Sequence, residues 1–349
     1  ARAHSDTMNY MENLADRAGY IIHGANDKNV PPKHGENLRD ALKMYTSDVK
    51  YHEEPGAGHW WNDGSTPGAD CVNWPPLFEF MKNHQLDPNE LDFKFKSPGP
   101  WYSAEHSYVT IRSSESPKKD CVLESKKSGA KTVELTTTNV RSMDIDGEAL
   151  RDKGIETVVV DGSSKSVPMG TLEIGPRDGK RPGLNSTLNE VFRAPFCFVY
   201  PDDGAKELRA YASFLTSTWS IRGNGNACSV PLSQVDSRLK SERNLVYVGV
   251  PFDEIPDAQN RPFSWSDSEI SIGSWSFSTA MAFILFPQGD RPAAAFVTTK
   301  GTEAFLFNFH PFSSRTGMPD YRVISAQGGD AAGFFDPEWK FDASLGAKR

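Results

Sequence analysis

YIIHGANDKNVPP (residues 20–32) and YHEEPGAGHWW (residues 51–61) are the two stretches that decide the fold of the first part of the chain. Each begins with a run typical of a strand and continues into a loop rich in Gly, Asn or Pro. Each loop displays one polar residue, Asp27 in the first stretch and His59 in the second. The pair is a candidate for two members of a catalytic triad.

The residues around these stretches predict alternating helices and strands up to about residue 90. Asp6 is a candidate N-cap for a first helix that ends at Gly19, and a short buried strand follows over 19–24. The remaining elements are a helix after Pro32, a strand over 48–54 and a last helix that begins at Pro75. This order implies a parallel sheet covered by helices, as in the α/β class.

The order of Asp27 and His59 fits the chemistry of serine hydrolases. In such an enzyme a histidine takes the proton of the nucleophile, and an acid fixes the imidazole tautomer and stabilises its charge. In α/β-hydrolases the chain order is Ser, then Asp or Glu, then His, on loops that follow parallel strands. The alternative is structural: Asp27 would cap amides in its own turn, and His59 would be a loop histidine with no proton to move.

The segment HGANDKNVPP…YHEEPGAGHWW resembles the C-terminal end of the catalytic domain in prolyl-oligopeptidase-family serine hydrolases. That family shows an H-G-x-x-D-x-x-V-P stretch that carries the acid, and a G-x-G-H or G-x-x-H stretch that carries the base. The resemblance implies that Asp27 is the triad acid and His59 the triad base. Asp63 is the alternative acid if replacing Asp27 with Asn leaves activity intact. The clear match covers about residues 10–85, and the remainder resembles more loosely the long C-terminal extension of some large family members.

The nucleophile of such a triad is missing from the sequence. It belongs on a G-x-S-x-G elbow upstream of the acid. Ser5 is the one serine before Asp27, and no glycines flank it in AHSDT; IGSWSF (272–277) lacks the second glycine and lies downstream. We therefore expect the chain to be the C-terminal part of a serine hydrolase, inactive alone, with its serine upstream.

Beyond residue 90 the pattern changes twice. Short β-rich runs separated by Gly, Ser, Lys and Asp predict an antiparallel sandwich or sheet, and PRDGKRPG (176–183) is the best candidate for a linker. Alternation then returns, with Thr187 and Glu190 as a possible capping box, a helix over 203–219 and several buried strands that include EAFLFNF. We expect three domains: the C-terminal end of an α/β-hydrolase catalytic domain (1–90), a β-rich sandwich-like domain (91–180) and a second α/β domain (181–349).

Composition excludes several classes of partner. A net charge of −8 and a pI near 5.6 argue against nucleic acid, and the longest apolar run, AMAFILF (280–286), is far too short to span a membrane. The four cysteines lack zinc-site spacing and are too few for a disulfide scaffold. Asn185 begins a glycosylation sequon, a motif too common to fix a compartment. No ligand spacing for a metal is seen among His34, His52, His84, His106 and His310. His23 stands just before Gly24 at a strand end, where we expect it to have a structural role and to bond to the neighbouring loop.

Two hypotheses follow for function. The first is a peptidase-like serine hydrolase without cofactor, in which the partners of this chain are a peptide or ester substrate and the missing N-terminal part of the enzyme. The second is a non-catalytic binding or scaffold protein that kept the α/β-hydrolase fold.

Overall fold

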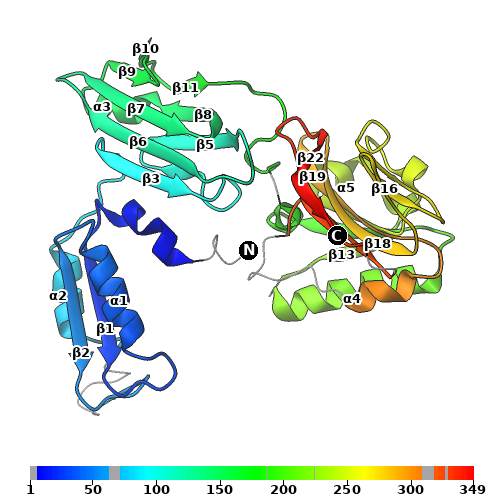
Figure 1. The fold of residues 1–349 in the computed structure, drawn as a ribbon, viewed down its shortest axis with the longest axis horizontal. Coiled ribbons are helices and arrows are strands. Elements are labelled where there is room, and N and C mark those ends of the chain that lie inside the picture. The colour runs from blue at the N-terminus through cyan, green and yellow to red at the C-terminus, as the bar shows by residue number, and fades with distance from the viewer. Residues whose placement is uncertain (1–5, 63–70, 186, 224, 309–317, 327–328) are drawn as a thin grey trace.

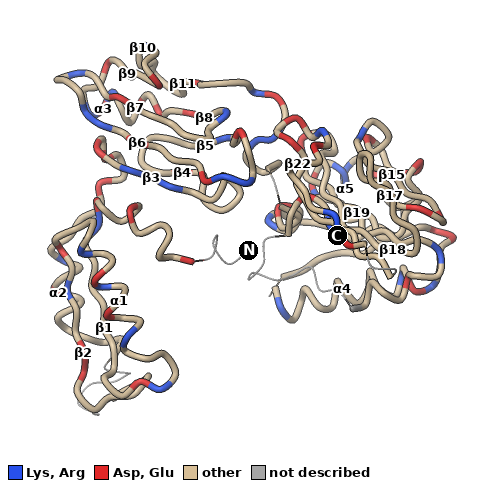
Figure 2. The backbone as a smooth tube through the Cα atoms, viewed as in Figure 1, with Lys and Arg blue, Asp and Glu red and all other residues tan. Residues whose placement is uncertain are grey.

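The structure is a computed structural model that describes residues 6–62, 71–185, 187–223, 225–308, 318–326 and 329–349. Ser5, Asp63 and His310 lie outside the described residues. The chain has a mixed α/β fold rich in strands, which form several sheets (Figure 1). Acidic and basic residues are both found in each of the three parts of the chain (Figure 2). Among the described helices, none has both the length and the apolar character that crossing a bilayer requires.

The first group of elements has the predicted alternation. It consists of a 3-10 helix, two parallel strands paired with each other and two α-helices. Asp6 caps the first helix through a bond from the Met8 N–H, but that helix is a short 3-10 segment and does not reach Gly19. The bounds are η2 (Thr7–Leu14), β1 (Gly19–Gly24), α1 (Lys33–Leu42), β2 (Val49–Glu54) and α2 (Pro75–Lys82).

Strand β1 was expected to be buried, and this prediction was wrong. Of its six residues only Gly24 is buried, and the others are half-buried. The reason is that, within the described residues, β1 and β2 pair only with each other, so few elements cover them. Helix α2 likewise has no buried residue.

The β-rich middle of the chain contains two sheets over one core. Their strand orders are β10-β9-β7-β6-β3 and β11-β8-β5-β4, and every pair is antiparallel except β7 with β9. Buried residues of both sheets form one cluster with the helix α3 (Gly147–Asp152). The strands are β3 (Phe93–Ser97), β4 (Glu105–His106), β5 (Val109–Ser114), β6 (Cys121–Lys127), β7 (Thr132–Thr138), β8 (Val140–Asp146), β9 (Thr157–Val160), β10 (Ser163–Ser166) and β11 (Thr171–Ile174).

The 3-10 helix η2 ties the first group to this middle part. The side-chain amide of Asn13 donates from Nδ2 to the Lys96 carbonyl at 2.7 Å and accepts the Lys96 N–H on Oδ1 at 2.7 Å. Lys96 lies on β3, the edge strand of its sheet. The segment before the candidate acid is therefore fixed to the β-rich part by a two-point contact.

The last part of the chain is built on an eight-stranded sheet of order β13-β12-β14-β19-β18-β20-β21-β22. The first four strands are parallel and the others are antiparallel to their neighbours. The elements are η3 (Leu188–Phe192), β12 (Phe196–Tyr200), α4 (Lys206–Arg222), β13 (Cys228–Pro231), η4 (Leu232–Gln234), α5 (Ser237–Glu242), β14 (Asn244–Val248), η5 (Phe252–Glu254), β15 (Phe263–Trp265), β16 (Ile270–Ile272), β17 (Trp275–Phe277), β18 (Ala280–Gln288), β19 (Arg291–Thr298), η6 (Glu303–Asn308), β20 (Tyr321–Ser325), β21 (Ala331–Phe335) and β22 (Phe341–Lys348).

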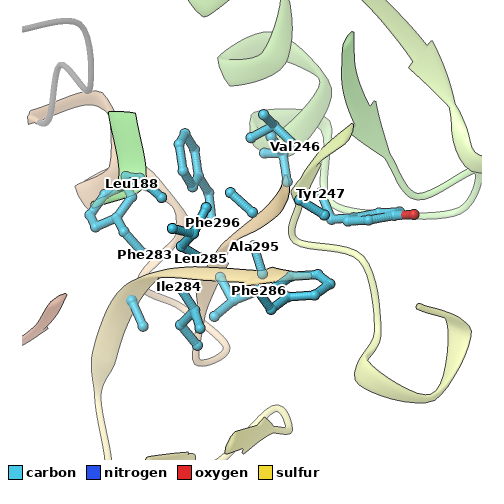
Figure 3. Packing of buried hydrophobic residues seen from close by; sticks show 14 of the residues in the cluster. Leu188, Val246, Tyr247, Phe283, Ile284, Leu285, Phe286, Ala295 and Phe296 are labelled. Carbon is cyan, nitrogen blue, oxygen red and sulfur yellow. The ribbon is translucent and has the colours of Figure 1, made fainter. Parts of the chain in front are cut away.

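The core of this part lies on both faces of the central strands. The apolar run 280–286 forms most of β18, and every residue of that strand except Gln288 is buried. Side chains of β18 alternate between the faces and pack with β14 and β19, as Figure 3 shows. Each fully buried side chain of this size contributes roughly 1.5–3 kcal/mol to stability. A strand covered on both faces has to be apolar at successive positions, which explains the unbroken run.

A disulfide joins Cys197 and Cys228, which are direct partners in the parallel strands β12 and β13. No sequence pattern indicates this pairing, because the two cysteines are 31 residues apart and become neighbours only in the folded sheet. Cys71 and Cys121 are free thiols.

The segment 176–183 is held more firmly than a linker. Lys180 is buried, and its ammonium donates to Asp320 Oδ2 at 2.6 Å and to the Phe335 carbonyl at 2.7 Å. Asp320 also accepts the backbone N–H groups of Thr187 and Phe335, each at 2.9 Å. The buried Lys180 charge thus has a counter-ion, and the Asp320 carboxylate accepts three hydrogen bonds from the protein in place of water.

Two local predictions in this part were wrong. Thr187 makes no side-chain cap for η3, because its backbone bonds to Asp320 and Glu190 is buried against Arg193. EAFLFNF contains the 3-10 helix η6 and no strand over its described residues.

Asn185 is only 2% exposed, so its side chain is inaccessible to glycosylation in the folded protein.

Candidate active site

The loops that follow β1 and β2 meet at the carboxyl end of the two-stranded sheet. The Ala25 N–H donates to the Glu54 carbonyl at 2.9 Å, and the Asn26 N–H donates to the Ala57 carbonyl at 2.7 Å. Parallel pairing places both strand ends at the same edge, so the loops after them are neighbours. These bonds fix the backbone of the Asp27 loop to the backbone of the His59 loop.

Gly24 permits this close approach. A Cβ atom at this position would lie 2.1 Å from the Gly58 carbonyl oxygen and 2.7 Å from that of Ala57. Both contacts are with backbone atoms, which cannot rotate away as a side chain can. Glycine is thus the residue that fits where the second loop crosses the end of β1.

Asp27 is held in place from three directions. Its Oδ1 accepts the backbone N–H groups of Asn29 at 2.8 Å and Val30 at 2.9 Å. Its Oδ2 lies 2.8 Å from Nδ1 of His59. The side chain is 5% exposed. The local amide bonds that a turn aspartate makes and the contact expected of a triad acid are therefore present together.

These contacts set the charge of Asp27. Burial opposes ionisation, but the hydrogen bonds from the Val30 N–H, from His59 and from the Asn29 N–H outweigh it. Together they lower the pKa of Asp27 from 3.8 to about 2. At neutral pH the group facing His59 is thus a carboxylate.

His59 points its Nδ1 at this carboxylate and is 36% exposed at the side chain. Since Nδ1 faces Asp27, the N–H of the neutral imidazole lies on Nδ1 and the lone pair on Nε2. No described residue supplies a hydrogen-bond partner to Nε2. The ring has the tautomer and the accessible nitrogen that a general base requires.

Two neighbours complete the site. His23, at the end of β1, bonds through Nε2 to the Val30 carbonyl at 2.8 Å and lies 3.4 Å from Asp27 Oδ2, in the structural position expected for it. Trp60 packs edge to face on the His59 ring, with centroids 5.4 Å apart, and is 69% exposed.

Three other histidines of the described residues have structural partners. His52 stacks on Trp74, and His84 bonds to Asp48 at 2.7 Å on the surface. His106 stacks on Phe95, and burial lowers its pKa. Within the described part of the chain, no group of three or more His, Cys, Asp or Glu residues is arranged to hold a metal ion.

The structure thus brings the side chains of Asp27 and His59 into hydrogen-bonding contact. Sequence reasoning missed the two loop-to-loop backbone bonds and the role of Gly24. The glycines of PGAGH indicated a sharp bend, but nothing in the local sequence says that this bend rests on Gly24.

Residues 2–84 match the prolyl oligopeptidase family. An uncharacterized secreted protein of Arthroderma benhamiae (strain ATCC MYA-4681 / CBS 112371) is 23% identical over 390 aligned residues, which are 96% of this chain and 40% of that protein. The chain therefore spans two fifths of the length of this relative. No solved structure matches it. The resemblance to the prolyl oligopeptidase family is confirmed for residues 2–84, the part of the chain that carries Asp27 and His59.

Proposed function

We propose that residues 1–90 are the C-terminal end of an α/β-hydrolase catalytic domain in a peptidase-like serine hydrolase. In this proposal Asp27 is the triad acid, His59 is the base, and a longer chain supplies the serine upstream. The observation that carries the proposal is the 2.8 Å contact between Asp27 Oδ2 and His59 Nδ1 within a segment that matches a family of hydrolases.

The proposed reaction uses both ring nitrogens of His59. Nε2 removes the hydroxyl proton of the serine as its oxygen attacks the carbonyl carbon of a peptide or ester. The proton then passes from Nε2 to the leaving amine or alcohol, and an acyl-enzyme forms. Water, deprotonated by the same nitrogen, releases the acid product and restores the serine. Asp27 keeps Nδ1 protonated throughout and stabilises the imidazolium.

The incomplete covering of the first group supports the proposal that the sheet continues in a longer chain. Parallel sheets normally have both faces covered, and two strands alone are marginal. Here Trp60, Phe78, Met81 and Leu86 are 69%, 44%, 58% and 63% exposed. We propose that upstream strands and helices of the hydrolase pair with β1 and cover these side chains.

The test is kinetic and uses the full-length protein encoded together with its upstream region. His59→Ala and Asp27→Asn should each abolish most peptidase or esterase activity while KM changes little. Loss of His59 removes the base; Asp27→Asn leaves the ring free to adopt the wrong tautomer, a fault that costs about 10⁴ in kcat in the chymotrypsin-type triad that serves as the standard example. His84→Ala is the matched control, because His84 also contacts an aspartate but lies outside the site.

A fluorophosphonate probe separates this proposal from the scaffold alternative. It should label one serine upstream of residue 1 in the full-length protein and no serine in residues 1–349 alone. Stoichiometric labelling within 1–349 would show that the nucleophile is misplaced. Absence of labelling and of turnover in the full-length protein would favour the non-catalytic scaffold.

A further inference from the structure

The eight-stranded sheet contains a topological switch point. From β12 the chain passes through α4 to β13 on one side of β12, and then through α5 to β14 on the other side. The connection that follows β12 runs to β13, whereas the connection that follows β14 runs the other way along the sheet, to β18 and β19. The loops after β12 and β14 therefore separate at the carboxyl ends of the parallel strands. Open α/β sheets bind their ligands in the crevice that such a separation makes.

A cavity of about 550 Å³ occupies this position. Its wall comes from the loop after β12 (201–205), the loop after β14 (249–253), the turn after β15 (265–267) and the end of β19 with the segment that follows (297–303). The volume is in the range typical of sites for small molecules. The cavity shares no residue with the Asp27 and His59 loops.

The wall of the cavity carries charges of mostly one sign. Asp203, Asp253, Asp267 and Glu303 line it, and among its described lining residues Lys300 is the one with a basic side chain. No described basic residue forms an ion pair with any of the four acids. Carboxylates gathered around a concave, partly apolar surface concentrate a negative potential there.

One side of the cavity is aromatic and held in place. The indole Nε1 of Trp265 donates to the Val250 carbonyl at 3.0 Å, and the Phe252 ring packs edge to face against Trp265 with centroids 5.0 Å apart. Both aromatic residues line the cavity and are only partly buried. Aromatic faces attract organic cations through the negative charge of the ring face.

We propose that this cavity binds a small organic cation, an amine or guanidinium group carried on an apolar chain. The carboxylates receive the charged group, and Trp265 with Phe252 contacts the apolar chain. The proposal concerns binding only and is independent of the hydrolase function proposed for residues 1–90.

Calorimetric titration of the 1–349 chain with 1,5-diaminopentane tests it, with 1,5-pentanediol as the uncharged counterpart. We expect the diamine to bind with a Kd below about 1 mM and the diol at least ten-fold more weakly, because ionic contacts in a partly enclosed site strengthen binding. Asp253→Asn combined with Asp267→Asn should weaken diamine binding at least ten-fold.

Two further variants fix the location. Glu254→Gln removes the same charge next to Asp253 but outside the cavity lining, and it should leave the Kd unchanged. Lys300→Met removes a repulsive charge and should tighten diamine binding several-fold. The proposal is overturned if the diamine does not bind, if the diol binds equally well, or if the double variant with an unaltered Tm binds the diamine as the wild type does.

Discussion

Gly24 controls how closely the loops of Asp27 and His59 approach each other. In Gly24→Ala the new methyl group meets the backbone oxygens of Ala57 and Gly58, so the second loop has to move away. We expect a local destabilisation of roughly 1–3 kcal/mol, typical of overpacking. Faster hydrogen exchange in peptides covering 20–32 and 51–61 measures it.

The control is Gly129→Ala, since the nearest atom to a Cβ there is 4.0 Å away and Gly129 has no positive φ. Exchange in 20–32 and 51–61 should be unchanged by this substitution. Equal exchange in Gly24→Ala and the wild type would show that the loops tolerate a side chain.

The low pKa of Asp27 makes its contribution to stability depend on pH. The carboxylate has a pKa of about 2 in the folded chain against 3.8 ordinarily, so the unfolded chain binds protons more readily. The stabilisation is fully present above pH 3.8 and is lost as the pH falls through about 2. The difference in Tm between wild type and Asp27→Asn should therefore be constant from pH 7 to about 4 and shrink from there to pH 2. A difference in Tm that is as large at pH 2 as at pH 7 would contradict this.

The Cys197–Cys228 disulfide joins two strands and stabilises the edge of the eight-stranded sheet. It closes a loop over 31 residues that contains α4. Replacing both cysteines with alanine should cost about 3–4 kcal/mol, mainly because the unfolded chain regains freedom. Thermal unfolding measures the loss, and Cys71→Ala, which removes a free thiol, is the control.

Thiol counting checks the bond itself. Denatured protein that has not been reduced should show two reactive thiols, from Cys71 and Cys121, and four after reduction. Four thiols before reduction would mean that the bond does not form.

The elements of the first 90 residues were predictable because their signals are local. Apolar periodicity, the Pro31-Pro32 pair and the glycine-rich loops indicated β1, α1 and β2 close to their actual bounds. Aromatic and apolar residues in EAFLFNF favoured a strand, but the fold places them in the 3-10 helix η6, which packs on α4 through Phe307 and Tyr211. A short apolar run does not say which of the two it will form.

The candidate site was predictable for the same reason, since Asp27 and His59 each stand in a local motif. The cavity of the last sheet was not, because its acids Asp203, Asp253, Asp267 and Glu303 come from four separate segments of the chain. Only the strand order brings these loops together, and no periodicity encodes that order. The disulfide could not be predicted either, because only the strand order makes Cys197 and Cys228 neighbours.

The three parts of the chain should differ in their ability to fold alone. Residues 1–90 have few buried apolar side chains and expose many, whereas the last part has a large core of its own. We expect isolated 1–90 to be insoluble or molten. A cooperative thermal transition of this piece would show that it is a complete domain.

Two pieces of the last part that begin at different residues test whether the Lys180–Asp320 pair belongs to this folding unit. A piece beginning at residue 176 keeps Lys180, and a piece beginning at 181 leaves Asp320 buried without its counter-ion. Removing one partner of a buried pair costs about 3–5 kcal/mol, so 176–349 should unfold at clearly higher urea concentration than 181–349. Equal midpoints would show that the pair contributes little.

The contact between Asn13 and Lys96 also bears on how the molecule avoids self-association. An edge strand offers free N–H and C=O groups on which a strand of another molecule can add. On β3 the backbone N–H and C=O of Lys96 are both hydrogen-bonded to the Asn13 side-chain amide. An incoming strand therefore cannot pair with β3 at this residue. Asn13 thus prevents a strand of another molecule from pairing with this edge of the sheet. Asn13→Ala should free the backbone N–H and C=O of Lys96 and produce larger, concentration-dependent species in sedimentation velocity runs. Asn9→Ala should not.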